Sequence, residues 1–275
     1  MHRRLTLRWS RLAPAWHLAR LPEWFIIRPA GQAPYRRSRL SSNVRPHLNL
    51  RALAIAAILT PLYAAAAESQ CYGTVSNGRI EGSVKLPLSG SNFSAYSTLA
   101  ATAGRTHVHS KVAAIIEASY KALATANPST RYVYGETGWP SGGRFRPHRT
   151  HQNGLSVDFF VPVKNSRGQS VPLPTSLTDK LGYDAEFNQE AKYGEYTIDF
   201  EALAEHLYQL DIAAKAAGSG LALVIFDAQY LPGLFATRRG TYLKENLPFM
   251  KGKPWVRHDE HYHVDFAVPC KPNAA

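Results

Sequence analysis

Five of the eleven histidines fall into two short groups in the second half of the chain. Imidazole nitrogens and a single carboxylate are the ligands that zinc takes where one coordination position stays free for water. A chain that supplies both from two nearby segments can build such a site, so we predict a catalytic zinc ion. The two groups are His148-Arg149-Thr150-His151, followed by Asp158, and His258-Asp259-Glu260-His261-Tyr262-His263.

The expected ligands are His151, Asp158 and His263, holding one zinc ion per chain. Three protein ligands plus water is the catalytic arrangement, whereas a fourth protein ligand would close the site. His261 lies two residues before His263, and alternate side chains of a strand point to the same face. We therefore assign His261 to proton transfer with the zinc-activated water. A lone histidine on a strand is usually a surface residue, and only the coincidence of the two spacings favours a site.

Two stretches with alternating polarity, 155–163 and 262–268, are the strands expected to carry these residues. In each, one face is apolar and the other carries the candidate ligands. The stretch 107–126 reads as a helix, and a second helix is expected to begin after Asp199 and end at Gly218. Residues 135–149 and 164–198 read as long loops, and we interpret His107, His109 and His206 as structural. These elements predict an α+β fold, with a central antiparallel sheet that carries the metal site and is flanked by helices and long loops.

The net charge of +12 is unevenly distributed along the chain. Residues 1–67 hold 11 Lys/Arg and one acidic residue, whereas residues 68–275 hold 21 Lys/Arg and 19 Asp/Glu. The basic character therefore belongs to the N-terminal segment, and the remainder carries no charge excess suited to nucleic acid. We expect no nucleic-acid partner.

Residues 44–67 have the pattern of a secretory signal peptide, with Arg45 and Arg51 before a short apolar run and four alanines before Glu68. The run is too short to span a bilayer, so no stable membrane span is expected after its removal. We expect translation to start near Val44, which makes 1–43 a mis-annotated extension; a long n-region or a retained anchor is the alternative. Residues 68–275 are then a single catalytic domain. Its oligomeric state is left open.

The chain has two cysteines, Cys71 and Cys270, near the two ends of this domain. In an exported protein such a pair is usually a disulfide, and we predict this one. Two unpaired buried thiols are the alternative. Metal ligation is disfavoured because no C-x-x-C spacing exists.

The histidine groups and their surroundings resemble the penicillin-insensitive murein endopeptidase family. This family is related to zinc peptidases of the lysostaphin, D-Ala-D-Ala and hedgehog types. The resemblance covers about residues 68–271. It rests on Gly138-Trp139-Pro140-Ser141-Gly142-Gly143-Arg144-Phe145, on His148-x-x-His151-Gln152-x-Gly154-Leu155-x-Val157-Asp158, on His258-Asp259-x-His261-x-His263-Val264, and on the shorter matches Cys71-Tyr72-Gly73, Leu86-Pro87-Leu88 and Val224-Ile225-Phe226.

The resemblance implies zinc on the three ligands named above, His261 as the base, and His148 and His258 as residues that bind or orient substrate. It further implies hydrolysis of D-alanyl–meso-diaminopimelyl crosslinks of peptidoglycan in the periplasm, without a serine nucleophile and hence insensitive to β-lactams. Arg144, in the glycine-rich loop, suits a carboxylate of the substrate because a guanidinium binds carboxylates at two points. A solvated loop charge is its alternative.

Three features depart from the family pattern. Asp265 stands where a basic residue is typical, Ser156 replaces a usual acidic residue, and relatives often have more than two cysteines. Because of the first two features, the identity of the bond that is cleaved stays undecided. A zinc D,D- or L,D-carboxypeptidase acting on peptidoglycan stems is an alternative, as is a peptidoglycan-binding module that retains a metal without activity.

Overall fold

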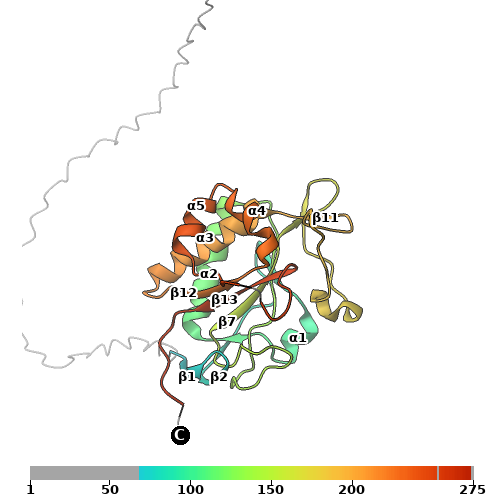
Figure 1. Ribbon diagram of the computed structural model, residues 1–275. Coiled ribbons are helices and arrows are strands. Elements are labelled where there is room, and N and C mark those ends of the chain that lie inside the picture. The colour runs from blue at the N-terminus through green and yellow to red at the C-terminus, as the bar shows by residue number, and fades with distance from the viewer. Residues whose placement is uncertain (1–67, 253, 274–275) are drawn as a thin grey trace, which may run out of the picture. The chain divides into compact units, whose positions relative to one another are not determined.

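A five-stranded sheet lies at the centre of the part of the chain that the computed structural model describes, residues 68–252 and 254–273 (Figure 1). The predicted leader segments 1–43 and 44–67 lie outside these residues. All neighbouring strands are antiparallel except β4 and β6, which pair in parallel. The α+β prediction is therefore confirmed, with one parallel pair at the sheet edge. The strand order is β12 (Leu221–Ile225), β13 (His261–Phe266), β7 (Ser156–Phe160), β6 (Tyr132–Tyr134) and β4 (Phe93–Ala95).

Two long helices, α2 (Ser110–Ala126) and α3 (Phe200–Ala216), pack against each other and lie together beside this sheet (Figure 1). Asp199 caps α3 by accepting a hydrogen bond from the backbone N–H of Ala202, as predicted. Helix α2 begins three residues later than predicted. His107 and Val108 instead form strand β5, which pairs with β3 (Val84–Lys85).

The remaining elements are short. Residues 164–198, predicted to be an irregular loop, contribute to a small four-stranded sheet and a 3₁₀ helix, because pairing between distant residues such as Lys164 and Thr197 forms strands that no local apolar pattern indicates. The four strands are β10 (Lys192–Tyr193), β11 (Tyr196–Ile198), β8 (Val163–Lys164) and β9 (Ser170–Val171), and the 3₁₀ helix is η1 (Leu177–Gly182). The others are β1 (Gln70–Thr74), β2 (Asn77–Glu81), α1 (Thr98–Thr102), η2 (Ala228–Tyr230), α4 (Leu231–Phe235) and α5 (Gly240–Asn246).

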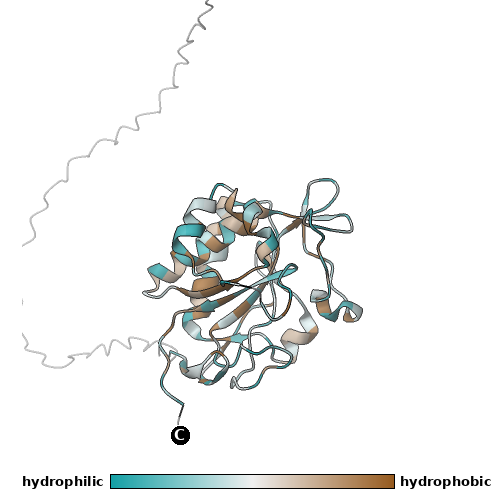
Figure 2. Cartoon of the chain, in the orientation of Figure 1, coloured by the Kyte–Doolittle hydropathy of each residue, from teal (hydrophilic) through white to brown (hydrophobic). Residues whose placement is uncertain are grey.

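The core lies on both faces of the central sheet. In Figure 2 the hydrophobic colour is strong in strand β12, whereas many of the outer turns are hydrophilic. Every residue of β7 and β13 is buried. The apolar faces are thus buried as expected, but the face with the candidate ligands is also covered by polypeptide. Strand alternation predicted the two faces and could not show that a loop would cover the polar one.

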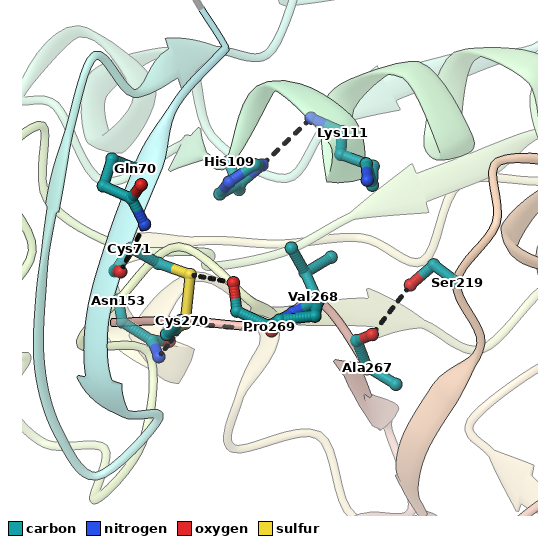
Figure 3. Close-up of a disulfide and its surroundings, with 10 residues drawn as sticks. All are labelled: Gln70, Cys71, His109, Lys111, Asn153, Ser219, Ala267, Val268, Pro269 and Cys270. Atoms are coloured by element: carbon teal, nitrogen blue, oxygen red, sulfur yellow. Dashed lines mark hydrogen bonds between the residues drawn. A yellow bond between two sulfur atoms is a disulfide. The ribbon is translucent and has the colours of Figure 1, made fainter. Parts of the chain in front are cut away.

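The predicted disulfide joins Cys71 on β1 to Cys270, which follows β13 (Figure 3). The side-chain amide of Asn153 donates a hydrogen bond to the sulfur of Cys270 at 3.5 Å. Because Asn153 belongs to the segment that leads into β7, the disulfide lies next to the backbone that carries His151. Among the residues that the structure describes, no helix has both the length and the apolarity to cross a membrane.

Candidate metal centre

The pairing of β7 with β13 brings the two histidine motifs together. In the register of these antiparallel strands, His263 lies directly opposite Asp158. Side chains of such a pair point to the same face and meet. The Nδ1 atom of His263 lies 2.9 Å from Oδ1 of Asp158, and both residues are buried. Two residues that are 105 positions apart in the chain are therefore neighbours.

His151 reaches Asp158 from the loop that precedes β7. Its Nε2 atom lies 3.3 Å from Oδ1 of Asp158, and its Nδ1 atom lies 3.2 Å from the carbonyl oxygen of Thr137. The backbone of His151 has a φ of +67°, which is uncommon for a residue with a side chain. Gly154, three residues later, has a φ of +77° and so close an approach to Ile80 that a side chain would clash. The backbone of this loop therefore adopts an uncommon conformation, which places the His151 ring beside Asp158.

The Nε2 atom of His151 is the feature that most favours a metal. It is buried and has no hydrogen-bond partner among the described residues. With Nδ1 donating its proton to the Thr137 carbonyl, Nε2 carries a free lone pair. A buried, unpaired nitrogen that faces a carboxylate is costly unless a further group binds there. A cation between His151 and Asp158 would satisfy both.

Asp158 is surrounded by further hydrogen-bonding groups. Tyr183 donates its hydroxyl proton to Oδ2 at 3.1 Å, and the ring nitrogens of His148 and His261 lie 3.7 and 3.9 Å from the same oxygen. Burial alone would raise the pKa of Asp158, but the surrounding imidazoles, His151 and His261 first, hold it well below its ordinary value. The carboxylate is therefore ionised and available as a ligand.

His263 lies between two carboxylates. Its Nε2 atom is 2.8 Å from Oδ1 of Asp265, on the side of the ring away from Asp158. Burial opposes the charge on His263, but Asp265 and Asp158 outweigh it and raise the pKa of the imidazole to about 10. Metal binding would replace the proton on Nδ1, because a ligand histidine must be neutral.

His148 lies closer to the centre than the sequence suggested. One nitrogen each from His148 and His151 and one oxygen of Asp158 lie within 4.8 Å of one another, a spacing that suits a metal ion. The Nε2 atom of His148 is already bound at 2.6 Å by Glu136, so only Nδ1 faces Asp158. The structure thus offers two candidates for the third ligand, the predicted His263 and also His148.

The predicted base, His261, lies on the same strand face as His263. Its Nε2 atom faces Asp158, and its Nδ1 atom lies 2.8 Å from a carboxyl oxygen of Glu260. Burial lowers the pKa of His261 to about 4, with the nearby Asp158 charge acting in the opposite direction. The ring is therefore neutral near pH 7 and free to accept a proton.

The ring of His258 lies beside that of this base, tilted by 38° and with ring centroids 4.6 Å apart. Its Nδ1 atom lies 2.9 Å from the carbonyl oxygen of Val256, and burial lowers the pKa of His258 to about 3. Four of the five histidines of the two motifs therefore surround Asp158, and His258 lies beside one of them.

Several residues of the site were not predicted from the sequence. Glu136 receives a bidentate ion pair from Arg105 and a hydrogen bond from Tyr96, and it holds His148. The pKa of Glu136 would be raised by burial, but His148 and Arg105 lower it to about 2. These residues lie in or next to loops without periodicity, so no pattern in the sequence indicated that they would meet. The close approach of Tyr183 requires glycine at position 135, because a side chain there would collide with the Tyr183 hydroxyl.

A cavity of about 620 Å³ opens onto the site and is lined by His148, Tyr183, Glu260 and His261. Its outer wall includes Trp255. Arg144 does not line it. Arg144 lies instead with Arg146 and Arg149 around a second cavity, which shares His148 and Arg149 with the first.

Comparison with known proteins gives the same family that the motifs suggested. The sequence model of the family described as penicillin-insensitive murein endopeptidase matches residues 71–197, which include His148, His151 and Asp158. Proteins named penicillin-insensitive murein endopeptidase from Escherichia coli O1:K1 / APEC, E. coli strain SMS-3-5 and E. coli O45:K1 strain S88 are each 28% identical over 205 residues. The match spans 74% of this chain and 68% of each relative. The resemblance carried by the histidine motifs is confirmed, and the chain is similar to the penicillin-insensitive murein endopeptidases.

Proposed function

We propose that residues 68–275 form a zinc-dependent murein endopeptidase that hydrolyses D-alanyl–meso-diaminopimelyl crosslinks of peptidoglycan. The observation that carries this proposal is the buried Nε2 atom of His151, which lacks a hydrogen-bond partner among the described residues and faces Asp158. The names of the relatives supply the substrate class. The histidines of the two motifs supply metal ligands and a group for proton transfer.

We assign His151, Asp158 and His263 as the ligands of one zinc ion. Two imidazoles and a carboxylate match the donor set of catalytic zinc, and the remaining position is left for water. When bound, zinc polarises a carbonyl group and activates water as a nucleophile near neutral pH. Tyr183 supports the set by donating a hydrogen bond to the second oxygen of Asp158.

His261 would move the proton in this reaction. Its neutral Nε2 atom, on the side facing Asp158, would accept a proton from the attacking water and return it to the leaving amine. The hydrogen bond between Nδ1 of His261 and Glu260 orients the ring for both steps. No serine nucleophile takes part, so β-lactams should not inhibit.

The substrate would lie in the cavity of about 620 Å³. We assign His148 and His258 to binding or orienting the peptide, since both rings adjoin the proposed zinc position. Arg144 would pair with a carboxylate of the substrate from the neighbouring cavity, beyond His148. The exposed Arg144, Arg146 and Arg149 have no salt bridge to any acidic residue in the described part of the chain, which leaves them available to an anionic group.

We further propose that residues 44–67 direct the protein to the periplasm, where its substrate lies. The disulfide supports an oxidising compartment.

The test is digestion of purified crosslinked muropeptides with the purified exported protein, with and without a chelator. We expect dimers to become monomers, the reaction to stop on chelation and resume with zinc, and penicillin to have no effect. Release of D-alanine from monomers with dimers intact would instead identify a carboxypeptidase. Binding to peptidoglycan without any cleavage would identify a binding module.

A further inference from the structure

We propose that Asp265, held in place by Ser156, is a positioning residue that fixes the His263 ring for metal binding. The inference rests on the proposed function and deepens it. It assigns a role to two residues at which this chain departs from the pattern of the family that it resembles.

The geometry is a chain of two hydrogen bonds behind the proposed ligand. Ser156 donates its hydroxyl proton to Oδ1 of Asp265 at 2.5 Å, and the same oxygen lies 2.8 Å from Nε2 of His263. Ser156 and Asp265 are directly opposite each other in the β7–β13 register, two positions along from Asp158 and His263 and therefore on the same face of the sheet. All four residues are 5% exposed or less. The strand pairing therefore fixes the arrangement without help from a loop.

The consequence concerns which nitrogen of His263 carries a proton. Because Nε2 faces a carboxylate, it must be the donor. Nδ1 is then the atom that presents a lone pair once a cation arrives, and Nδ1 already lies 2.9 Å from Asp158. Without Asp265, the ring could keep its proton on Nδ1 and turn its lone pair away from the site. A carboxylate behind a ligand histidine also makes the imidazole a stronger donor.

Ser156 acts only through Asp265. Its hydroxyl makes a single hydrogen bond within the described residues, and that bond is to Asp265. Asp265 itself lies on the far side of the His263 ring from Asp158. This position suits a supporting group and not a fourth ligand.

The test measures the zinc dissociation constant by competition with a chromophoric chelator. The variants of the exported protein are Asp265→Asn, Ser156→Ala and the double variant. Outer groups of this kind contribute about 10- to 100-fold to metal affinity. We expect Asp265→Asn to weaken zinc binding by that factor with the stoichiometry kept at one. Ser156→Ala should weaken it less, and should add nothing in the Asp265→Asn background.

The matched control is Asp211→Asn, which removes another buried carboxylate, on helix α3 and away from the site. Asp211 contacts Lys215 of the same helix and Tyr242 of α5. It should lower the free energy of unfolding without changing zinc affinity, which separates positioning from a structural role. Ser156→Ala removes only a hydroxyl, so it keeps the test open if Asp265→Asn folds poorly.

Wild-type zinc affinity in both Asp265→Asn and Ser156→Ala would overturn the inference. Complete loss of the zinc stoichiometry in Asp265→Asn would also overturn it, by making Asp265 a ligand. Absence of zinc binding in the wild-type protein would instead remove the proposed function itself. The two failures are therefore distinguishable.

Discussion

Asp158 is the residue on which the proposed site depends, because four imidazole rings approach its two oxygens. His263 and His151 approach Oδ1, and His148 and His261 approach Oδ2. A buried carboxylate whose pKa is lowered by several surrounding imidazoles is typical of a functional site. The coincidence of the two sequence motifs in space is therefore what makes this region a candidate active site.

Replacing His261 by alanine tests the role of the proposed base. We expect kcat on crosslinked muropeptides to fall by about 10²- to 10⁴-fold, the usual contribution of a general acid–base group. Zinc should remain at one per chain, because His261 is not in the ligand set. His107→Ala is the matched control, since that ring bonds the carbonyl oxygen of Gly104, outside the site. Loss of zinc in His261→Ala would mean that the roles of the histidines are reversed.

The sequence predicted the grouping of these residues better than their surroundings. His151, Asp158, His261 and His263 could be placed together because strand alternation and motif spacing both constrain them. The contacts of His148 with Glu136, and of Asp158 with Tyr183, join segments without periodicity. Such contacts depend on the folded path of loops, which no local pattern encodes.

At the scale of the elements, strands β7 and β13 carry the site. Helix α3 is the element that local sequence signals predicted most accurately. The Asp199 cap and the apolar stripe defined α3 almost to the residue. The alternation in β7 and β13 was equally clear. What alternation could not predict was that residues 164–198 form strands and η1, because these elements are held by tertiary contacts and not by their own propensity.

The disulfide between β1 and the segment after β13 provides a prediction at this scale. Replacing both Cys71 and Cys270 by serine should lower the free energy of unfolding by about 2–5 kcal/mol, because the crosslink restricts the unfolded chain over a sequence separation of 199 residues. Chemical denaturation of the variant and the oxidised wild type measures the difference.

The control is a reductant, which should destabilise the wild type and leave the Cys71→Ser/Cys270→Ser variant unchanged. Equal unfolding midpoints for the oxidised and reduced wild type would contradict the prediction.

At the scale of the whole molecule, the two faces of the central sheet have different roles. The site lies on one face, whereas Phe159 and Tyr262 point to the other and contact His206 of α3. His206 is also in contact with Tyr120 and Tyr132, all uncharged aromatic neighbours, and its Nδ1 atom is hydrogen-bonded to Tyr262. The interpretation of His206 as a core residue is thereby supported.

This core histidine predicts how stability depends on pH. Burial lowers the pKa of His206 from 6.5 to about 3, so the unfolded chain binds a proton that the folded protein rejects. The stabilisation is complete above pH 6.5 and is lost as the pH falls from 6.5 towards 3, by up to about 1.4 kcal/mol per pH unit. Urea unfolding of the chelator-treated protein across this range measures the slope, since metal binding adds its own pH dependence.

His206→Phe keeps an aromatic ring in the same place and is the matched variant. Its unfolding free energy should fall less steeply than that of the wild type between pH 6.5 and 3. Identical slopes in the two proteins would contradict the assignment of a buried neutral imidazole.

The most direct measurement is the zinc content of the wild-type protein and of four single variants, each equilibrated in the same zinc buffer. We predict one zinc per chain in the wild type, in His148→Ala and in His261→Ala, and loss of zinc in His151→Ala and His263→Ala. Retention of zinc in His263→Ala together with its loss in His148→Ala would contradict the proposed ligand set. Absence of zinc from the wild type would contradict the metal centre altogether.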